Sequence, residues 1–481
     1  MLFNTPVFLL LFLPVALLSY CAVDKAYRNI ILVIFNLIFF AFGEPIYILL
    51  LLLSIVVNFF LGLQIDKKDA LQRKLMVAAA VAFNIGILAI FKYAEFLTAS
   101  LGGFFSLFWV GLGDFVPIAK VMLPIGISFF ALQGVSYVVD IYKKIAPPEQ
   151  NFIKFALYIS FFPKLIAGPL TRYNEIGNSL SDRKSSLSET AEGLKRFSIG
   201  LAKKVLIADN MAIVADKVFA LGEKQLTISL SWVGLICFAF QIYYDFSGYI
   251  DMALGLGRVF GFKLPESFDY PYLATSIKNF WRRWNITVTR WFKDYLYIPL
   301  GGSRKGKKRV YFNLILVFVL YGLWHGTTWT FFFWGAFFGI FLLLERFPPF
   351  AKILNWVHPI VRWIYTMFVV LMGWVIFRAD SFDHMVTYIK ALFGFGYYSS
   401  VTGVFEYFDN EGFIALLFAF LLVSPFAKKG WDILMEKLSK RIQNLKIITE
   451  IVQICLLAFV VFLSIISIVN GTSAPSYFYR F

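Results

Sequence analysis

A single histidine lies between two strongly apolar stretches, where a polar side chain is energetically costly. His325 stands in the sequence Tyr-Gly-Leu-Trp-His-Gly-Thr-Thr at positions 321–328, and the chain has only two other histidines, His358 and His384. An ionisable residue at membrane depth is a functional-site candidate by default. Because an imidazole exchanges a proton near neutral pH, His325 is the first candidate for a general base.

The surroundings of His325 leave two interpretations open. A buried structural histidine that bonds to a backbone carbonyl would give the same pattern. The neighbouring Trp324, Gly326 and Thr327 favour a cavity over tight packing.

The apolar stretch around His325 is too long to be one spanning helix. Residues 311–344 would make a helix about 51 Å long, whereas the hydrocarbon core is about 30 Å thick. We therefore expect a break near residues 325–328. A first helix that begins at Tyr311 would have about 14 residues and span roughly 21 Å, so His325 is expected inside the membrane core.

Residues 277–298 combine tryptophans, basic residues and one asparagine at helical spacing. On a helix with about 100° per residue, the aromatic and apolar side chains share one arc of about 120°: they are Phe280, Trp281, Trp284, Val288, Trp291, Phe292 and Tyr295. The basic side chains fall on the opposite side: they are Arg282, Arg283, Arg290 and Lys293. We expect one helix at the cytosolic interface, with Asn285 at the edge of the aromatic arc and turned toward the protein.

Two interpretations of this helix remain. It can be an interfacial anchor, with tryptophans in the headgroup belt and arginines on the headgroups. It can also form a cationic mouth for an anionic, phosphate-bearing donor. The sequence Pro-Leu-Gly-Gly at 299–302 is expected to end the helix, because glycine supplies turn conformations.

Other charged residues lie in apolar surroundings: Asp140, Lys164, Arg172, Asp245 and Asp251. We interpret them chiefly as ion-pair or hydrogen-bond partners that hold helices together, and we keep Asp245 as a candidate substrate-binding residue. The sequence has no Ser-His-Asp order, no phosphate-binding glycine loop and no Cys/His spacing typical of a metal site.

The composition indicates an all-α polytopic membrane protein. The 481 residues are 59% hydrophobic and 15% charged, whereas soluble domains are about 45–50% apolar. The net charge of +16 could suggest nucleic-acid binding, but the basic residues cluster between apolar runs, as in cytosolic loops, so no nucleic-acid partner is expected. Cys21, Cys237 and Cys455 are far apart, and neither a disulfide framework nor a metal site is expected.

About 11 to 14 segments can cross or re-enter the membrane, since roughly 20 apolar residues span it. The candidate runs are 6–22, 29–43, 45–64, 75–98, 103–139, 152–170, 193–221, 228–256, 310–324, 329–345, 358–377, 385–396, 412–426 and 447–469. The first is interpreted as a retained helix rather than a signal peptide. Residues 278–309 carry ten basic residues and one acid and are expected in the cytosol. Residues 428–446 have the spacing of an interfacial amphipathic helix, with a plain helical connector as the alternative.

Six motifs together resemble the membrane-bound O-acyltransferase family. They are LPIGISF at 123–129, FPKLIAGPLTR at 162–172, YDFSGY at 244–249, FWRRW at 280–284, WFKDYLYIPLGG at 291–302 and GLWHG at 322–326. Their order and spacing are specific, and the similarity is densest from 120 to 345. Within the family, the chain resembles the bacterial branch of alginate O-acetyltransferase and the teichoic-acid D-alanyl transfer protein.

The resemblance implies a funnel of helices around a central tunnel, formed by one domain over residues 1–481 with a catalytic core at about 120–345 and C-terminal helices at 358–481. It implies that a cytosolic thioester donor, acetyl-CoA, gives its acyl group to a hydroxyl, with no bound cofactor. In this branch the acyl group reaches an extracytoplasmic polysaccharide, such as alginate or peptidoglycan, with an acyl-accepting or SGNH-type partner protein. A multi-pass location in the bacterial cell membrane follows.

The resemblance also implies roles for individual residues. The expected catalytic residues are His325 and Asn285. The expected substrate-binding residues are Trp281, Arg282, Arg283, Trp284, Trp291, Lys293, Trp324 and Asp245. Asn285 departs from the branch, which usually has a second histidine there, and this puts a two-histidine proton relay in doubt. An asparagine can still orient a substrate or donate to a carbonyl.

Two other functions are weighed against O-acetyl transfer. D-alanyl transfer to teichoic acid is the rival within the family. A transporter predicts inverted repeats and ionisable residues along a pathway, and the sequence has neither. The aromatic tail, residues 473–481, resembles the C-terminus of the family and is expected to face outside, with a frayed end as the alternative.

Overall fold

The computed structural model describes residues 1–106, 121–183, 186–395, 403–439 and 445–471. Within these residues the chain is helical and has no β-strand, as the all-α prediction requires. Six helices among them are long and apolar enough to cross a membrane: Ile48–Lys67, Ala70–Ser106, Ile228–Val259, Trp329–Arg346, Pro359–Arg378 and Ile447–Val469. Four shorter apolar helices accompany them: Val7–Ala22, Arg28–Gly43, Ile127–Tyr142 and Asn410–Leu422. The multi-pass membrane prediction is confirmed.

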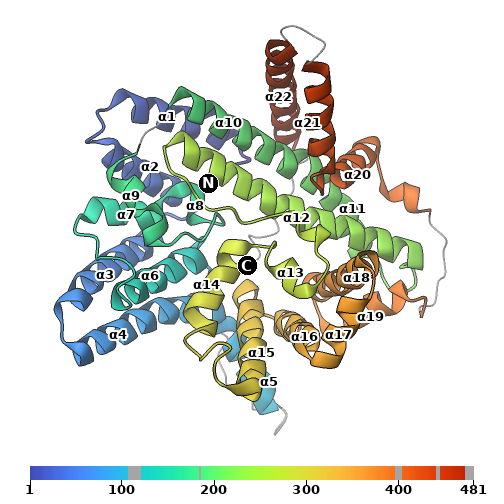
Figure 1. The fold of residues 1–481 in the computed structure, drawn as a ribbon, viewed down its shortest axis with the longest axis horizontal. Coiled ribbons are helices and arrows are strands. Elements are labelled where there is room, and N and C mark those ends of the chain that lie inside the picture. The colour runs from blue at the N-terminus through green and yellow to red at the C-terminus, as the bar shows by residue number, and fades with distance from the viewer. Residues whose placement is uncertain (107–120, 184–185, 396–402, 440–444, 472–481) are drawn as a thin grey trace.

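The N-terminal helices lie along one side of the molecule as far as Leu88, and the last of them lies at its lower end (Figure 1). Their bounds are η1 (Val7–Phe12), α1 (Leu13–Ala22), α2 (Arg28–Gly43), α3 (Ile48–Lys67), α4 (Ala70–Leu88), η2 (Ala89–Tyr93) and α5 (Ala94–Ser106). The helix from Ala70 to Ser106 is continuous, but it widens to a π-helical turn at η2. The predicted aromatic tail at 473–481 and part of the run at 103–139 fall outside the described residues.

The central helices include the most buried segment of the fold. Their bounds are α6 (Ile127–Tyr142), α7 (Phe152–Ser160), α8 (Phe162–Leu165), α9 (Tyr173–Ser181), α10 (Leu187–Ala202), η4 (Lys203–Ala208), α11 (Asp209–Phe219) and α12 (Ile228–Val259). Helices α10 and α12 run side by side across the molecule (Figure 1). Helix α12 is enclosed by protein along most of its length, so it forms the centre on which the other helices pack.

Glycines set the close approach of α10 and α12. A Cβ atom on Gly193 would lie 2.7 Å from the carbonyl oxygen of Gly255, and one on Gly200 would lie 2.6 Å from that of Gly248. The glycines are seven residues apart on both helices, so they recur on one face of each. Small residues let helix backbones meet closely in membranes, and this pairing keeps α10 against the core.

The remaining helices carry the candidate site and the C-terminal part. Their bounds are η5 (Pro271–Leu273), α13 (Ile277–Trp281), α14 (Ile286–Phe292), η6 (Lys293–Tyr297), α15 (Gly306–His325), α16 (Trp329–Arg346), α17 (Pro348–Trp356), α18 (Pro359–Arg378), α19 (Phe382–Leu392), η7 (Val404–Tyr407), α20 (Asn410–Leu422), α21 (Phe426–Ser439) and α22 (Leu445–Val469). Helices α21 and α22 project from the body (Figure 1). The helix predicted at 428–446 is confirmed as far as Ser439.

The prediction of one helix over residues 277–298 is wrong. Helix α13 ends at Trp281, and α14 begins at Ile286 after a turn in which Asn285 has a left-handed backbone, with φ of 42° and ψ of 54°. The backbone N–H of Ile286 donates to the carbonyl of Ser267 at 2.8 Å, which holds the turn against a neighbouring segment. The segment therefore bends at this turn instead of forming one straight helix.

The predicted break after His325 is confirmed, but the predicted start of that helix is wrong. Helix α15 ends at His325, and α16 begins at Trp329. Helix α15 begins at Gly306 and has 20 residues, about 30 Å, because the basic residues 307–309 join it. A helix of this length can span the core, so its length does not place His325 at mid-membrane. His325 is nevertheless buried inside the protein, with 4% of the residue exposed.

All five charged residues expected to be partners inside the protein have such contacts. The pairs are Asp140 with Tyr295, Lys164 with Gln133, Arg172 with Asp294, Asp245 with Lys204, and Asp251 with Arg196 and Lys203. They join helices that are distant in sequence, so their first role is structural, as predicted.

Candidate active site

The imidazole of His325 is enclosed by aromatic rings at the end of α15. Its ring centroid lies 4.8 Å from that of Tyr321, 5.0 Å from Trp324, 5.2 Å from Trp334 and 5.6 Å from Phe377. The helix ends here because Gly326 is extended, with φ of −159° and ψ of 167°. Only 4% of the residue is exposed, so these rings shield the imidazole from bulk solvent, which strengthens any electrostatic interaction with a reacting group.

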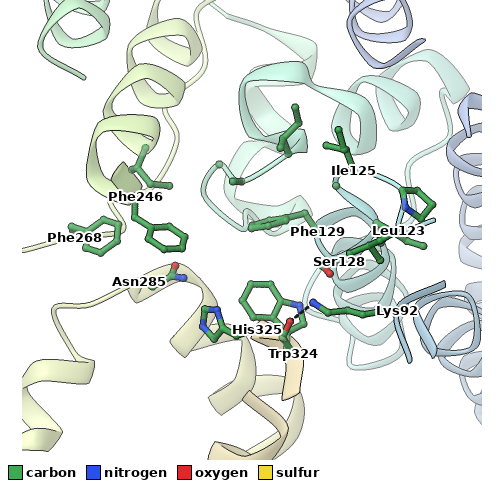
Figure 2. Close-up of a pocket in the computed structure, with 17 residues that line it drawn as sticks. Lys92, Leu123, Ile125, Ser128, Phe129, Phe246, Phe268, Asn285, Trp324 and His325 are labelled. Carbon is green, nitrogen blue, oxygen red and sulfur yellow. Dashed lines mark hydrogen bonds between the residues drawn. The ribbon is translucent and has the colours of Figure 1, made fainter. Parts of the chain in front are cut away.

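Asn285 reaches the same place from the turn between α13 and α14. Asparagine tolerates the left-handed conformation better than most residues, and here that conformation turns its buried side chain into a cavity shared with His325. Figure 2 shows the amide beside the imidazole. The structure therefore brings together the two residues that the sequence predicts to be catalytic.

A small cavity of about 100 Å³ contains both side chains. Its walls come from the segment before α6, from residues 166–168 and from Phe246 and Ile250 of α12. Trp324 and Lys92 complete the lining next to His325 (Figure 2). Lys92 is the only residue with a formal charge among the described residues that line this cavity.

A second, larger cavity of about 700 Å³ approaches the site from the basic segment. Its inner end has Trp281, Phe292 and Tyr321, and α15 lines it with one face, at residues 314, 317, 318 and 321. Five basic residues contribute to its lining: Lys278, Arg282, Lys293, Arg346 and Arg362. A mouth of this kind can hold phosphate groups, with an apolar chamber beyond it.

Tyr321 lies between the two cavities. It lines the large cavity, and its ring contacts His325, which lines the small one. A group that reaches Tyr321 from the basic mouth is thus one helical turn from the imidazole. The two cavities therefore come together at the contact between Tyr321 and His325.

Four of the predicted substrate-binding residues line neither cavity. Arg283 pairs with Asp269, Asp245 pairs with Lys204 at 3.2 Å, and the indole N–H of Trp291 donates to the carbonyl of Leu132 at 3.0 Å. The fourth stacks inside the core: Trp284 lies 5.5 Å from Phe280 and 4.9 Å from Trp374, between ring centroids. Their substrate-binding role stays a prediction, and their contacts are those of scaffold residues.

Five further residues line the cavities and are not among the site residues predicted from the sequence: Lys92, Ser128, Tyr321, Arg346 and Arg362. A signal for Lys92 was available, since it is one cation within an apolar run. No three His, Cys, Asp or Glu side chains gather as a metal site in the part of the chain that the structure describes.

The chain is similar in sequence to a known protein family and to several characterised proteins. Residues 127–380 match the sequence model of the membrane-bound O-acyltransferase family. The chain is 40% identical over 400 residues to a probable alginate O-acetylase AlgI of Azotobacter vinelandii, covering 82% of this chain and 79% of the relative. It is 38% identical over 432 residues to a peptidoglycan O-acetyltransferase of Helicobacter pylori, covering 82% and 80%. A teichoic acid D-alanyltransferase of Bacillus subtilis is 25% identical over 280 residues, which is 54% of this chain and 70% of the relative.

Proposed function

This chain belongs to the membrane-bound O-acyltransferase family and is an O-acetyltransferase, and from that premise we propose its donor, acceptor and site. The donor is acetyl-CoA on the cytosolic side. The acetyl group goes to hydroxyls of an extracytoplasmic polysaccharide, either an alginate-like exopolysaccharide or peptidoglycan. An extracytoplasmic acyl-accepting or SGNH-type protein is the partner, and the bacterial inner membrane is the location.

One observation carries this proposal: His325 lines the small cavity, and Tyr321, whose ring contacts the imidazole, lines the large cavity, which has a different lining. The large cavity has a basic mouth and an apolar inner end, which suits a nucleotide with phosphates followed by a thioester arm. Cavities of roughly 300–1,000 Å³ hold ligands of such size. The small cavity lies on the other side of Tyr321 and suits the acceptor.

In the proposed reaction, His325 takes the proton of the acceptor hydroxyl as its oxygen attacks the thioester carbonyl carbon. Negative charge develops on the carbonyl oxygen, and the amide N–H of Asn285 is the donor placed to stabilise it. Collapse of the intermediate breaks the carbon–sulfur bond. The imidazolium returns the proton to the leaving thiolate, so the products are an acetyl ester and free coenzyme A.

The test uses purified protein in lipid nanodiscs with radiolabelled acetyl-CoA, followed by thioester loss and label transfer. Consumption of acetyl-CoA supports the proposal. D-alanyl transfer is the second candidate, because of the similarity to teichoic acid D-alanyltransferases. A D-alanyl carrier thioester in a parallel reaction would be consumed in place of acetyl-CoA if that candidate were correct.

Replacing Asn285 separates its backbone role from its amide. Asn285→Ala should lower stability by about 1 kcal/mol, because alanine is strained in a left-handed conformation, whereas Asn285→Gly should not. Both variants should lower the rate of transfer about 100-fold, the typical loss for a missing oxyanion donor. Thermal unfolding and the nanodisc assay measure the two effects. Full transfer by Asn285→Gly would remove the amide from the mechanism.

The basic mouth should determine donor affinity. We expect Arg282→Gln to raise the KM for acetyl-CoA about fivefold with kcat unchanged, since an exposed charge pair is worth up to about 1 kcal/mol. The KM for acetyl-pantetheine, which has no nucleotide, should not change. Lys308→Gln is the matched control, because Lys308 is exposed in the same basic segment and lines neither cavity. Equal effects on both donors would contradict a phosphate-binding mouth.

A further inference from the structure

Lys92 is a buried lysine in a spanning helix, and the helix is distorted where it occurs. Only 6% of the residue is exposed. It lies in the π-helical turn η2, between α4 and α5 of the 37-residue helix Ala70–Ser106. Such turns within α-helices are frequent at functional sites. A charged residue in a membrane helix is rare and marks a functional site by default.

The π-helical turn holds the end of the helix that carries His325. The ammonium of Lys92 donates to the carbonyl of Trp324, and the hydroxyl of Tyr93 donates to the carbonyl of Leu323 at 2.7 Å. The last carbonyls of a helix have no partner within it, so these bonds cap α15. They place the ammonium in the small cavity, close to the imidazole.

The small cavity has several hydrogen-bond donors in its lining near Lys92. Lys92 makes no ion pair with any described acid. The hydroxyl of Ser128 and the indole N–H of Trp324 have no hydrogen-bond partner among the described residues, although the two residues are only 8% and 7% exposed. In Figure 2 the ammonium, the hydroxyl and the indole nitrogen gather on one side, and His325 and Asn285 lie on the other.

Three donors around an apolar cavity with no described carboxylate favour an anionic ligand. A buried donor without a partner costs about 1–3 kcal/mol, and a buried charge costs more. A carboxylate has two oxygens that accept several hydrogen bonds, which matches an ammonium, a hydroxyl and an indole N–H. A neutral hydroxyl would satisfy fewer of them and would leave the charge of Lys92 without a counterion.

We propose that Lys92, Ser128 and Trp324 form a subsite for the carboxylate of an acidic sugar in the acceptor glycan. The inference rests on the proposed function and narrows it. The sugar itself enters the small cavity, and the partner protein presents the polymer. The ring of Trp324 lies between the subsite and the base, with its centroid 5.8 Å from the Lys92 ammonium and 5.0 Å from the imidazole centroid. That span fits one sugar whose carboxylate and reacting hydroxyl lie on different carbons.

The test compares acidic oligosaccharides with their carboxyl-reduced forms on full-length protein in nanodiscs. One arm uses a fluorescent oligouronate and another a muramic-acid oligosaccharide, and both binding and acetylation are measured. We expect the wild type to bind one acidic form about 10- to 100-fold more tightly than its reduced counterpart, as a charge-assisted hydrogen bond predicts. The arm that shows the preference identifies the sugar.

Three variants separate the subsite from a structural cap. Lys92→Met should abolish the preference for the acidic form, and Ser128→Ala, which keeps the charge, should reduce it about 2- to 10-fold. Tyr93→Phe removes the neighbouring cap outside the cavity and should keep the preference. If Lys92→Met does not fold, Ser128→Ala still decides the question.

Several outcomes would overturn the subsite. The first is equal binding of acidic and reduced sugars by the wild type. The second is a full preference for the acidic form in either Lys92→Met or Ser128→Ala. The third is acetylation of a protein acceptor with no binding of sugars. Binding is measured without donor, so failure of the proposed acetyl-CoA reaction would leave the binding result intact. Binding preference without acetyl-CoA consumption would thus contradict the proposed function alone.

Discussion

His325→Ala should lower acetyl transfer by about a thousandfold or more while the protein stays folded in the membrane. A positioned general base contributes about 10²–10⁴ to a rate, and here the same imidazole must also return the proton to the leaving thiolate. The donor should still bind, because the basic mouth and the apolar end of the large cavity do not include His325. The expected signature is therefore a loss in kcat with little change in donor affinity.

The measurement is label transfer from acetyl-CoA in nanodiscs, with thermal unfolding of each variant alongside. His325→Gln removes the base but keeps a side chain among the aromatic rings that enclose His325. This variant should be as inactive as His325→Ala and more stable than it. His384→Ala is the control histidine, since His384 lies near Asp380 and lines neither cavity. Transfer at wild-type rate by a folded His325→Ala protein would refute the assignment of the base.

The end of α15 at His325 could be predicted from the sequence because length alone requires a break in residues 311–344. Its beginning could not. The apolar pattern stops at Val310, but the helix extends to Gly306, because long basic side chains can lie along a helix and keep their charges in the polar layer. The apolar pattern of a sequence shows which helical residues face apolar surroundings. It does not show whether a charged turn extends the helix beyond them.

The shape of residues 277–298 could not be predicted for a different reason. Their pattern fits one amphipathic helix, and the break arises from tertiary contacts of the turn with Ser267 and with the stacked core around Trp284. Tertiary context overrides local propensity in such cases. The same contacts place Asn285 next to His325. Helical spacing alone therefore could not predict that these two residues lie close together.

Lys92 could have been found by the argument that selected His325. Both are ionisable residues in apolar stretches, where such residues are rare and functional. The apolar run at 75–98 contains one basic residue, Lys92. What the sequence could not give is the contact of this lysine with Trp324, because the two residues are 232 positions apart.

Gly322→Ala should destabilise the protein by about 3 kcal/mol or more and abolish transfer together with folding. Helices α15 and α16 touch through glycines, and a Cβ atom on Gly322 would lie 2.3 Å from the carbonyl oxygen of Phe331 and 3.0 Å from the backbone nitrogen of Gly335. Backbone atoms cannot rotate away as a side chain can, so the helices must separate. Overpacking typically costs about 1–3 kcal/mol and more when backbones shift. Separation would also move Trp334 away from His325.

Two other glycines make this a graded test of close packing. A Cβ on Gly339 would meet the Cα of Ile315 at 3.2 Å, so Gly339→Ala should have an intermediate effect. Gly86 is the control within α4, because no atom lies within 4 Å of an added Cβ. Gly86→Ala should keep the stability or raise it by up to about 1 kcal/mol, since alanine favours a helix over glycine. Thermal unfolding in nanodiscs should show stability decreasing in the order Gly86→Ala, Gly339→Ala, Gly322→Ala. Equal stability of the three variants would mean that the backbone contact of α15 and α16 does not hold His325 in place.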